Sequence, residues 1–178
     1  MTRSVQTLSE AERRLAADWA ATCAERVLEL FEAEKPDDDR PRLAIARARA
    51  FARGELDVAT QIRRRFGGGS TSRDVSPAAL AAARAAGQAS AVCHMGAHAL
   101  GAAGYALKAA SLAHADQPHI VAREIDWQVG QLVPALRAAL CTLPPIGQDR
   151  SGPLGPGLLA SGQLGQLIGQ LQAALRSA

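Results

Sequence analysis

Apolar residues recur at every third or fourth position through most of this 178-residue chain, which is the spacing of amphipathic helices. The first stretch predicts a helix from Ser9 to about Glu34, in which Ser9 and Glu12 have the spacing of a capping box. Two neighbouring stripes give it a wide apolar face; they are Leu15, Trp19, Cys23, Val27 and Leu30, and Ala16, Ala20, Ala24, Leu28 and Phe31. Because β-branched residues are sparse and no alternating run persists, we expect an all-α fold without a sheet.

The segment Pro36–Arg42, with the sequence P-D-D-D-R-P-R, predicts a sharp turn between two helices. Pro36 cannot continue the first helix, an aspartate carboxylate can cap the next one, and Pro41 suits a first helical turn. We therefore expect a helical hairpin whose second helix starts near Pro41 and is interrupted at Gly54. The inward residues of this helix are predicted to be Leu43, Ile45, Ala48, Phe51 and Ala52.

Similar helix start and stop signals divide the rest of the chain into further helices. The predicted features are a helix start at Ser76–Pro77, a bend near Gly87, an end near Ala115, a new helix after Pro118, and a short helix from Pro134 to about Cys141. The bend is expected because a straight helix of that length would measure about 58 Å. Together these features predict a compact multi-helix bundle of antiparallel helical hairpins.

A proline- and glycine-rich stretch divides the chain near its C-terminal end. We predict a helical bundle domain over residues 1–143, a linker over 144–157, and a separate C-terminal helix over 158–178. Leu164, Ile168, Leu171 and Leu175 recur at helical spacing in a segment without charges, so this helix needs an apolar surface to pack on. That surface is either the chain's own bundle or a second copy of the chain, which would make a homo-oligomer.

The charge pattern does not indicate a nucleic-acid partner. The formal net charge is +3 and is spread along the chain. The densest cluster, Arg63–Arg65, lies near the end of a turn or short helix predicted from Leu56 to Phe66, and a glycine-rich loop comes after it. We interpret it as a solvated helix end, with a phosphate or acidic-partner patch as the alternative. Only Phe66 interleaves with these arginines, so stacking on single-stranded nucleic acid is not supported.

The apolar segments and the cysteines indicate the cellular compartment of the protein. No apolar segment resembles a signal peptide, and no stretch is both long and apolar enough to cross a bilayer, so we expect the cytosol of a bacterium and no membrane contact. Cys23, Cys93 and Cys141 lie far apart, which argues against a disulfide framework and a zinc knuckle. We expect all three to be inert, buried thiols.

His94 and His98 are the only candidates for a metal site. Their spacing of four would place both imidazoles on one face of a helix, where Glu124 or Asp126 from a neighbouring helix could complete a ligand set. Glycines and alanines surround both histidines, which favours a close helix crossing instead. We therefore expect largely buried histidines that hydrogen-bond across the crossing, and no bound metal or other cofactor.

Several of these motifs together resemble a bacterial family of putative immunity proteins, the immunity-five-like helical domain. The motifs are W-A-A-T-C-A-E-R-V-L-E-L-F from Trp19, P-D-D-D-R-P-R from Pro36, A-I-A-R-A-R-A-F-A-R-G-E from Ala44, H-M-G-A-H-A-L-G-A-A-G-Y-A from His94, and Trp127-Gln128. The resemblance implies an all-α fold that binds and neutralises a cognate toxin, and it transfers no catalytic residue. The chain after Cys141 departs from the family pattern.

We therefore predict a non-enzymatic, protein-binding helical domain whose partner is a cognate bacterial toxin. The predicted partner-binding residues are Asp37, Asp38, Asp39, Arg40, Arg42, Arg49 and Arg53. One alternative is a metal-dependent helical-bundle enzyme that uses His94 and His98. The other is a purely structural protein that oligomerises through its C-terminal helix.

Overall fold

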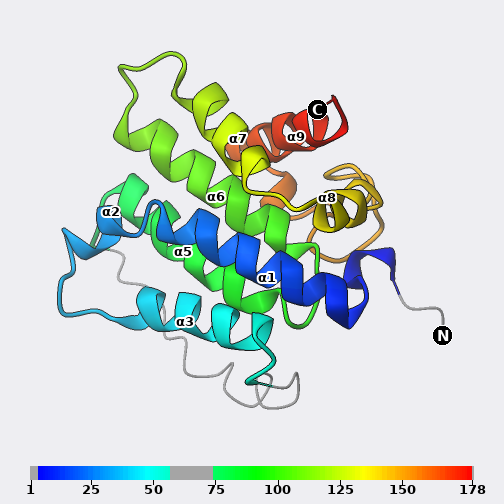
Figure 1. Cartoon of the computed structure of the whole chain (residues 1–178). Coiled ribbons are helices and arrows are strands. Elements are labelled where there is room, and N and C mark those ends of the chain that lie inside the picture. Colours follow the sequence, from blue (N-terminus) through cyan, green and yellow to red (C-terminus); the bar gives the residue numbers. More distant parts are fainter. Residues whose placement is uncertain (1–3, 57–73, 178) are drawn as a thin grey trace.

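The computed structural model describes residues 4–56 and 74–177, and in these residues all regular secondary structure is helical (Figure 1). The elements are η1 (Val5–Thr7), α1 (Glu10–Glu25), α2 (Glu29–Glu32), α3 (Arg40–Ala52), α5 (Pro77–Ala91), α6 (His98–Ala113), α7 (Ile120–Gly130), α8 (Pro134–Cys141), η3 (Leu158–Ala160) and α9 (Gly162–Ser177). The predicted all-α fold is confirmed. The predictions for Arg63–Arg65 and for the glycine-rich loop lie outside the described residues.

The first hairpin pairs α1 with α3, which run antiparallel (Figure 1). The capping box at the start of α1 is confirmed, because Ser9 Oγ accepts a hydrogen bond from the backbone N–H of Glu12 and the Glu12 carboxylate accepts one from the N–H of Ser9. Pro41 lies in the first turn of α3 as predicted. Gly54 follows the helix with φ +79°, a backbone conformation that favours glycine and ends α3.

Three details of this hairpin differ from the sequence prediction. The first helix ends at Glu25, and a turn over residues 26–28 separates it from α2, so there is no continuous helix to Glu34. Leu15 and Leu43 are exposed, Leu43 by 51%, although both were predicted to face inward. On α3 the buried face is made by Pro41, Ala44, Ile45, Ala48 and Phe51, and Leu43 falls outside it.

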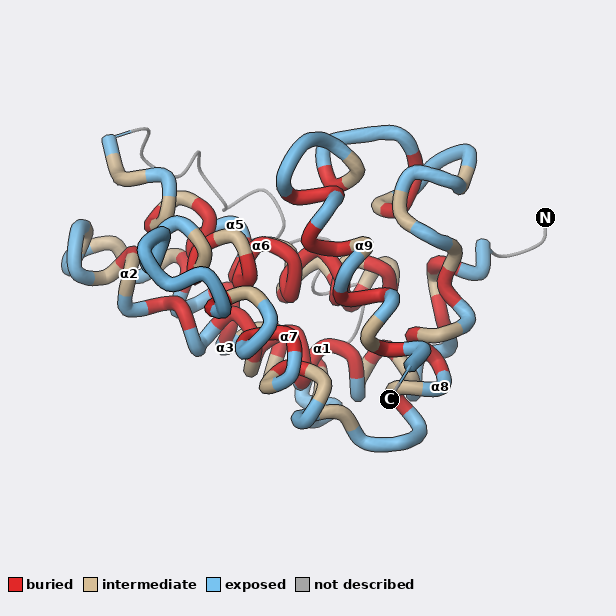
Figure 2. Tube along the Cα trace, turned by 90° about the horizontal axis from the view of Figure 1, so that it is seen from above, coloured by how far each residue is buried: buried red, intermediate tan, exposed pale blue. Residues whose placement is uncertain are grey.

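The centre of the molecule is a crossing of α5 and α6 built largely from alanine. The side chains of Ala82, Ala85, Ala102 and Ala103 are fully buried between helices, and α6 is buried along nearly its whole length. Figure 2 shows the buried residues concentrated along α6 and on the inner sides of the helices around it. Alanine lets helix backbones approach closely, which explains how a core with few aromatic residues is well filled.

The long central helix breaks at residues 92–97 and not at Gly87, which lies within α5 and has open space around it. The N-terminal turn explains the position of the break. The backbone N–H groups of Gly96 and Ala97 donate to the carbonyls of Thr7 and Gln6, at 3.1 and 3.0 Å. A Cβ atom on Gly96 would lie 2.5 Å from Leu8 Cδ1, so the break also provides space for the Leu8 side chain.

The C-terminal helix α9 packs against α6, α7 and α8 of the same chain. Its apolar stripe is buried as its spacing predicted; the residues are Leu164, Ile168, Leu171 and Leu175. The helix comes especially close at Gly104 of α6, where a Cβ atom would lie 2.4 Å from Ile168 Cγ1. The chain's own bundle therefore covers this stripe, and pairing of two copies through α9 stays a prediction.

The proline- and glycine-rich segment before α9 is held against the N-terminus by one buried side chain. Gln6 Nε2 donates to the Ser151 carbonyl at 2.7 Å and to the Asp149 carboxylate, and Gln6 Oε1 accepts from the backbone N–H of Leu154 at 3.0 Å. The Gln6 side chain thereby joins the N-terminal turn to the segment that precedes η3 and α9. The division into domain, linker and helix at residues 143 and 157 stays a prediction.

Glu34 joins α2 to the start of α5, and this contact predicts an effect of pH. Its carboxylate accepts hydrogen bonds from the hydroxyl and the backbone N–H of Ser76, which is the N-cap residue of α5. Both bonds favour the charged form, so they hold the pKa of Glu34 below its ordinary value of 4.5. The stabilisation is therefore present above about pH 4.5 and is lost as the pH falls through the lowered pKa of the folded state.

We accordingly expect the Glu34→Gln variant to melt below the native protein at neutral pH, and the difference in melting temperature to narrow below about pH 4.5. Thermal unfolding curves recorded across this pH range for both proteins provide the measurement. A difference that stays constant with pH would show that the charge of Glu34 does not contribute.

Candidate functional site

The predicted partner-binding residues lie on the polar face of the α1–α3 hairpin. The acidic residues Asp18, Glu25 and Glu32 recur at intervals of seven along α1 and α2, and Arg42 and Arg49 have the same interval on α3. Since seven residues make about two helical turns, Asp18 and Glu25 lie on one face of α1, and Arg42 and Arg49 lie on one face of α3. Glu32 continues the acidic row on α2. The antiparallel packing of the hairpin then sets the acidic row opposite the basic row.

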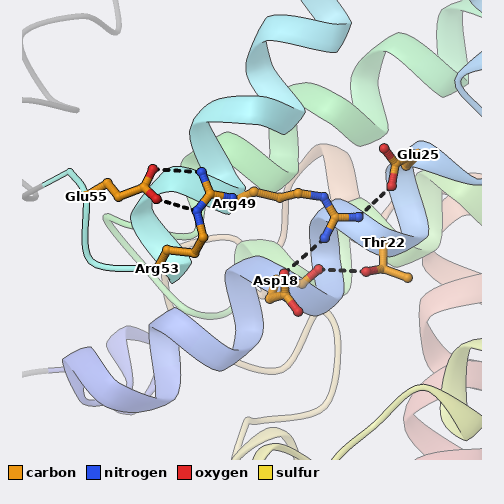
Figure 3. A network of polar contacts seen from close by, with 6 residues as sticks. All are labelled: Asp18, Thr22, Glu25, Arg49, Arg53 and Glu55. Carbon is orange, nitrogen blue, oxygen red and sulfur yellow. Dashed lines mark hydrogen bonds and ion pairs between the residues drawn. The ribbon is translucent and has the colours of Figure 1, made fainter.

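Each arginine of the basic row is bound to carboxylates across the hairpin. Arg49 contacts Asp18 at 3.0 Å and Glu25 at 2.5 Å, so it bridges two turns of α1 (Figure 3). Arg42 forms a two-point ion pair with Glu32, at 2.8 and 2.7 Å. The hydrogen bond from Arg42 to Glu32 raises the pKa of the arginine further above its ordinary value. These guanidinium groups are therefore held in fixed positions at the surface.

Arg53 pairs with Glu55 beyond the end of α3, at 2.6 and 2.7 Å (Figure 3). Both side chains are more than half exposed. Exposed pairs of this kind add little to stability, because water solvates the separated charges almost as well. Their main effect is to fix where the charges lie on the surface.

The corner between α2 and α3 contains the three consecutive aspartates. Asp38 binds the guanidinium of Arg40 through two contacts and accepts a hydrogen bond from the backbone N–H of Arg40. The side-chain contact with Arg40 lowers the pKa of Asp38. Asp39 occupies the N-cap position, but its side chain makes no capping hydrogen bond. Asp37 and Asp39 are exposed, and their carboxylates make no ion pair within residues 4–56 and 74–177.

The two histidines do not share a helix face, which corrects the geometry on which the metal hypothesis depended. His94 lies in the break between α5 and α6, whereas His98 is the first residue of α6. Both are of intermediate burial, neither fully buried nor exposed. His98 Nδ1 lies 2.8 Å from Gln88 Oε1 on α5, so the predicted hydrogen bond across the crossing is confirmed for this residue.

The side chain proposed as a third metal ligand is engaged elsewhere. Glu124 is buried and forms a two-point ion pair with Arg26, at 2.6 and 2.9 Å. Asp126 is exposed on α7. In the part of the chain that the structure describes, no group of three or more histidine, cysteine, aspartate or glutamate side chains could hold a metal ion.

The Arg26–Glu124 pair belongs to a cluster that sequence reasoning missed. The guanidinium of Arg26 also lies over the ring of Trp127, 4.0 Å from the ring centroid. Arg26 is in the turn after α1, and its partners come from α7, nearly a hundred residues later. Residues so distant in sequence have no local spacing pattern in common, so only the tertiary structure shows that they are in contact.

The three cysteines differ in burial, and the most deeply buried, Cys23, is not an activated nucleophile. Cys23 is fully buried, and burial followed by the charge of Glu124 raises the pKa of its thiol. Cys93 is buried and donates a hydrogen bond to the carbonyl of Ser90. Cys141 is half-buried, in contrast to the expectation that all three would be buried. A thiol with a raised pKa stays protonated and reacts poorly.

Comparison with known proteins assigns this fold to a family. Residues 6–135 match the family model described as Imm-5 like putative immunity protein. The match covers well over half of the chain, from η1 to the start of α8, and includes the polar face of the α1–α3 hairpin. No curated protein and no solved structure matches the chain. Among the described helices, none has the length and apolar character needed to traverse a bilayer.

Proposed function

We propose that this chain, which belongs to the Imm-5 like putative immunity protein family, binds a cognate toxin protein and neutralises it. The family match over residues 6–135 carries the proposal. The role is one of binding and not of catalysis. A structural support is that the paired charged residues of the α1–α3 hairpin lie together on one surface.

We place the toxin-binding surface on the α1–α3 hairpin, at the seven residues named from the sequence. Asp37 and Asp39 offer exposed carboxylates without an ion-pair partner among the described residues. Such carboxylates attract a partner that presents lysine or arginine side chains, because complementary charges steer association and fix its orientation. We therefore infer a basic patch on the toxin opposite this corner.

The paired arginines would contribute in a different way. Arg42 and Arg49 are already fixed by Glu32, Asp18 and Glu25. A side chain that is ordered before binding loses less conformational entropy when a partner arrives. The remaining N–H groups of these guanidinium groups can donate to carbonyls or carboxylates of a toxin without rearrangement of the hairpin.

Growth protection tests this function. The toxin-like protein encoded beside the gene for this chain is expressed in cells that also produce either the native chain or the Asp37→Asn/Asp39→Asn variant. We expect the native chain to restore growth and the variant to restore it less well, because the variant lacks the two exposed carboxylates. Asp116→Asn is the matched control, since Asp116 is exposed on the loop after α6 and its replacement also removes an acidic charge.

Failure of the native chain to protect against that protein would contradict the proposed function. Equal protection by the native chain and the double variant would leave the function standing and would remove the α2–α3 corner from the binding surface. Co-purification of the two proteins provides an independent measure of the same interaction.

A further inference from the structure

Trp127 differs from the other aromatic residues that the structure describes. Trp19, Phe31, Phe51 and Tyr105 are all buried in the core, whereas Trp127 is only half-buried. The indole N–H of Trp19 donates to the carbonyl of Gln128 at 2.9 Å. The indole N–H of Trp127 has no acceptor within residues 4–56 and 74–177. Trp127 therefore places a large ring and an unused donor at the surface.

Arg26 covers this ring and is held there by a buried carboxylate. The Arg26 side chain is 38% exposed, while that of Glu124 is only 9% exposed. Glu124 accepts from Nε and Nη2 of Arg26, which leaves the other guanidinium N–H groups without a partner in the described residues. The bond to Glu124 raises the pKa of Arg26, so the guanidinium stays charged. Stacking on Trp127 fixes the plane of the group as well.

Together these contacts form a rigid surface that is suited to recognition. Tryptophan and arginine are the residue types most enriched at the energetic centres of protein interfaces. Long side chains normally lose rotamer freedom on binding, but Glu124 and Trp127 already restrain Arg26. An ion pair that only stabilises a core is shielded from solvent on both sides. In this pair Glu124 is buried, whereas Arg26 faces solvent and has N–H groups that do not bind Glu124.

We propose that Arg26 and Trp127 form a second interaction surface, which binds a protein segment that presents a carboxylate. The carboxylate accepts from the free N–H groups of Arg26, and an oxygen of the same segment accepts from the indole N–H of Trp127. The surface lies where α1 ends, on its α7 side, whereas Glu25 faces α3. It is distinct from the Asp37–Asp39 corner and does not depend on whether the partner is a toxin.

Nuclear magnetic resonance of the ¹⁵N-labelled full chain tests this surface. The chain contains two tryptophans, so its spectrum has two indole N–H signals, and one of them reports on Trp127. A Trp127→Phe variant identifies the signal of Trp127. The probe is a short polyglutamate peptide, and a polylysine peptide of equal length is the control. We expect polyglutamate to shift the Trp127 signal in a saturable manner, with the Trp19 signal unchanged and polylysine without effect.

Arg26→Gln should weaken this binding by about tenfold, since a charge-assisted pair of hydrogen bonds is lost. Arg150→Gln, at an exposed arginine elsewhere on the chain, should leave it unchanged. The Trp19 signal reports whether each variant is folded. If Arg26→Gln does not fold, Arg26→Lys, which keeps the charge but not the planar fork, takes its place and should also bind more weakly. An unmoved Trp127 signal, or equal affinity in the Arg26 and Arg150 variants, would overturn the proposal.

Discussion

Replacing Ile168 by alanine should lower the free energy of unfolding by about 2–5 kcal/mol, the usual cost of truncating a fully buried isoleucine. Ile168 has no exposed surface, and it packs on Gly104 of α6. The truncation removes apolar contacts on both helices and leaves a cavity between them. Chemical denaturation followed by circular dichroism measures the loss. Because α9 follows the matched residues 6–135, the result also measures how strongly this segment stabilises the family domain.

Gly104 allows a sharper form of this experiment. Gly104→Ala alone should destabilise the fold, because its new methyl group would lie 2.4 Å from Ile168 Cγ1. In the double variant with Ile168→Ala, that methyl group enters the space that the isoleucine vacates. We therefore expect the double variant to be more stable than the sum of the two single effects predicts. Strict additivity would mean that α9 does not lie on α6 in solution.

Gln6→Ala should cost about 2 kcal/mol of stability, because it leaves the buried N–H of Leu154 in the 147–155 loop without a partner. The backbone N–H of Leu154 and the carbonyl of Ser151 both lose their bonds to the Gln6 side chain. Hydrogen exchange measures the effect locally, and the Leu154 amide should exchange much faster in the variant. Faster exchange is expected because the Gln6 side chain joins the 147–155 loop to the N-terminal turn.

Gln163→Ala is the matched control for Gln6→Ala. Gln163 lies on the exposed side of α9 and makes one long hydrogen bond, to Ser111 at 3.3 Å. The same change of side chain there should leave stability and loop exchange almost unaltered. Slow exchange at Leu154 in the Gln6→Ala variant would refute the assigned role of Gln6.

Local signals in the sequence were sufficient to predict where most helices begin. Ser9 with Glu12 caps α1 and Ser76 caps α5, as their chemistry predicts. Pro41 lies in the first turn of α3 as predicted, but the expected aspartate cap of that helix is not made. Helix caps depend on residues within one turn, so their chemistry can be read from a single stretch of sequence. The apolar spacing of α9 was equally informative, since its four predicted residues are all buried.

The breaks within helices could not be predicted in the same way. The interruption at residues 92–97 depends on backbone bonds to Gln6 and Thr7 and on space for Leu8, and all of these lie far away in the sequence. The metal hypothesis for His94 and His98 assumed an unbroken helix, so it lost its geometric basis with that assumption.

The two surfaces differ in how far the sequence revealed them. The arginines of α3 could be named in advance, and the interval of seven in both helices was a usable but overlooked signal for their ion pairs. Arg26, Glu124 and Trp127 are brought together only by the packing of α7 beside α1. Tertiary contacts of this kind have no signature in local spacing.

The toxin-neutralising role is tested by titrating the purified chain into a purified candidate toxin, such as the product of a toxin-like gene found beside its own, with the activity of that toxin as the readout. We expect the activity to fall in proportion to the added chain and to be abolished near equimolar amounts. Full activity in the presence of a large excess of folded chain would show that this protein does not neutralise that toxin.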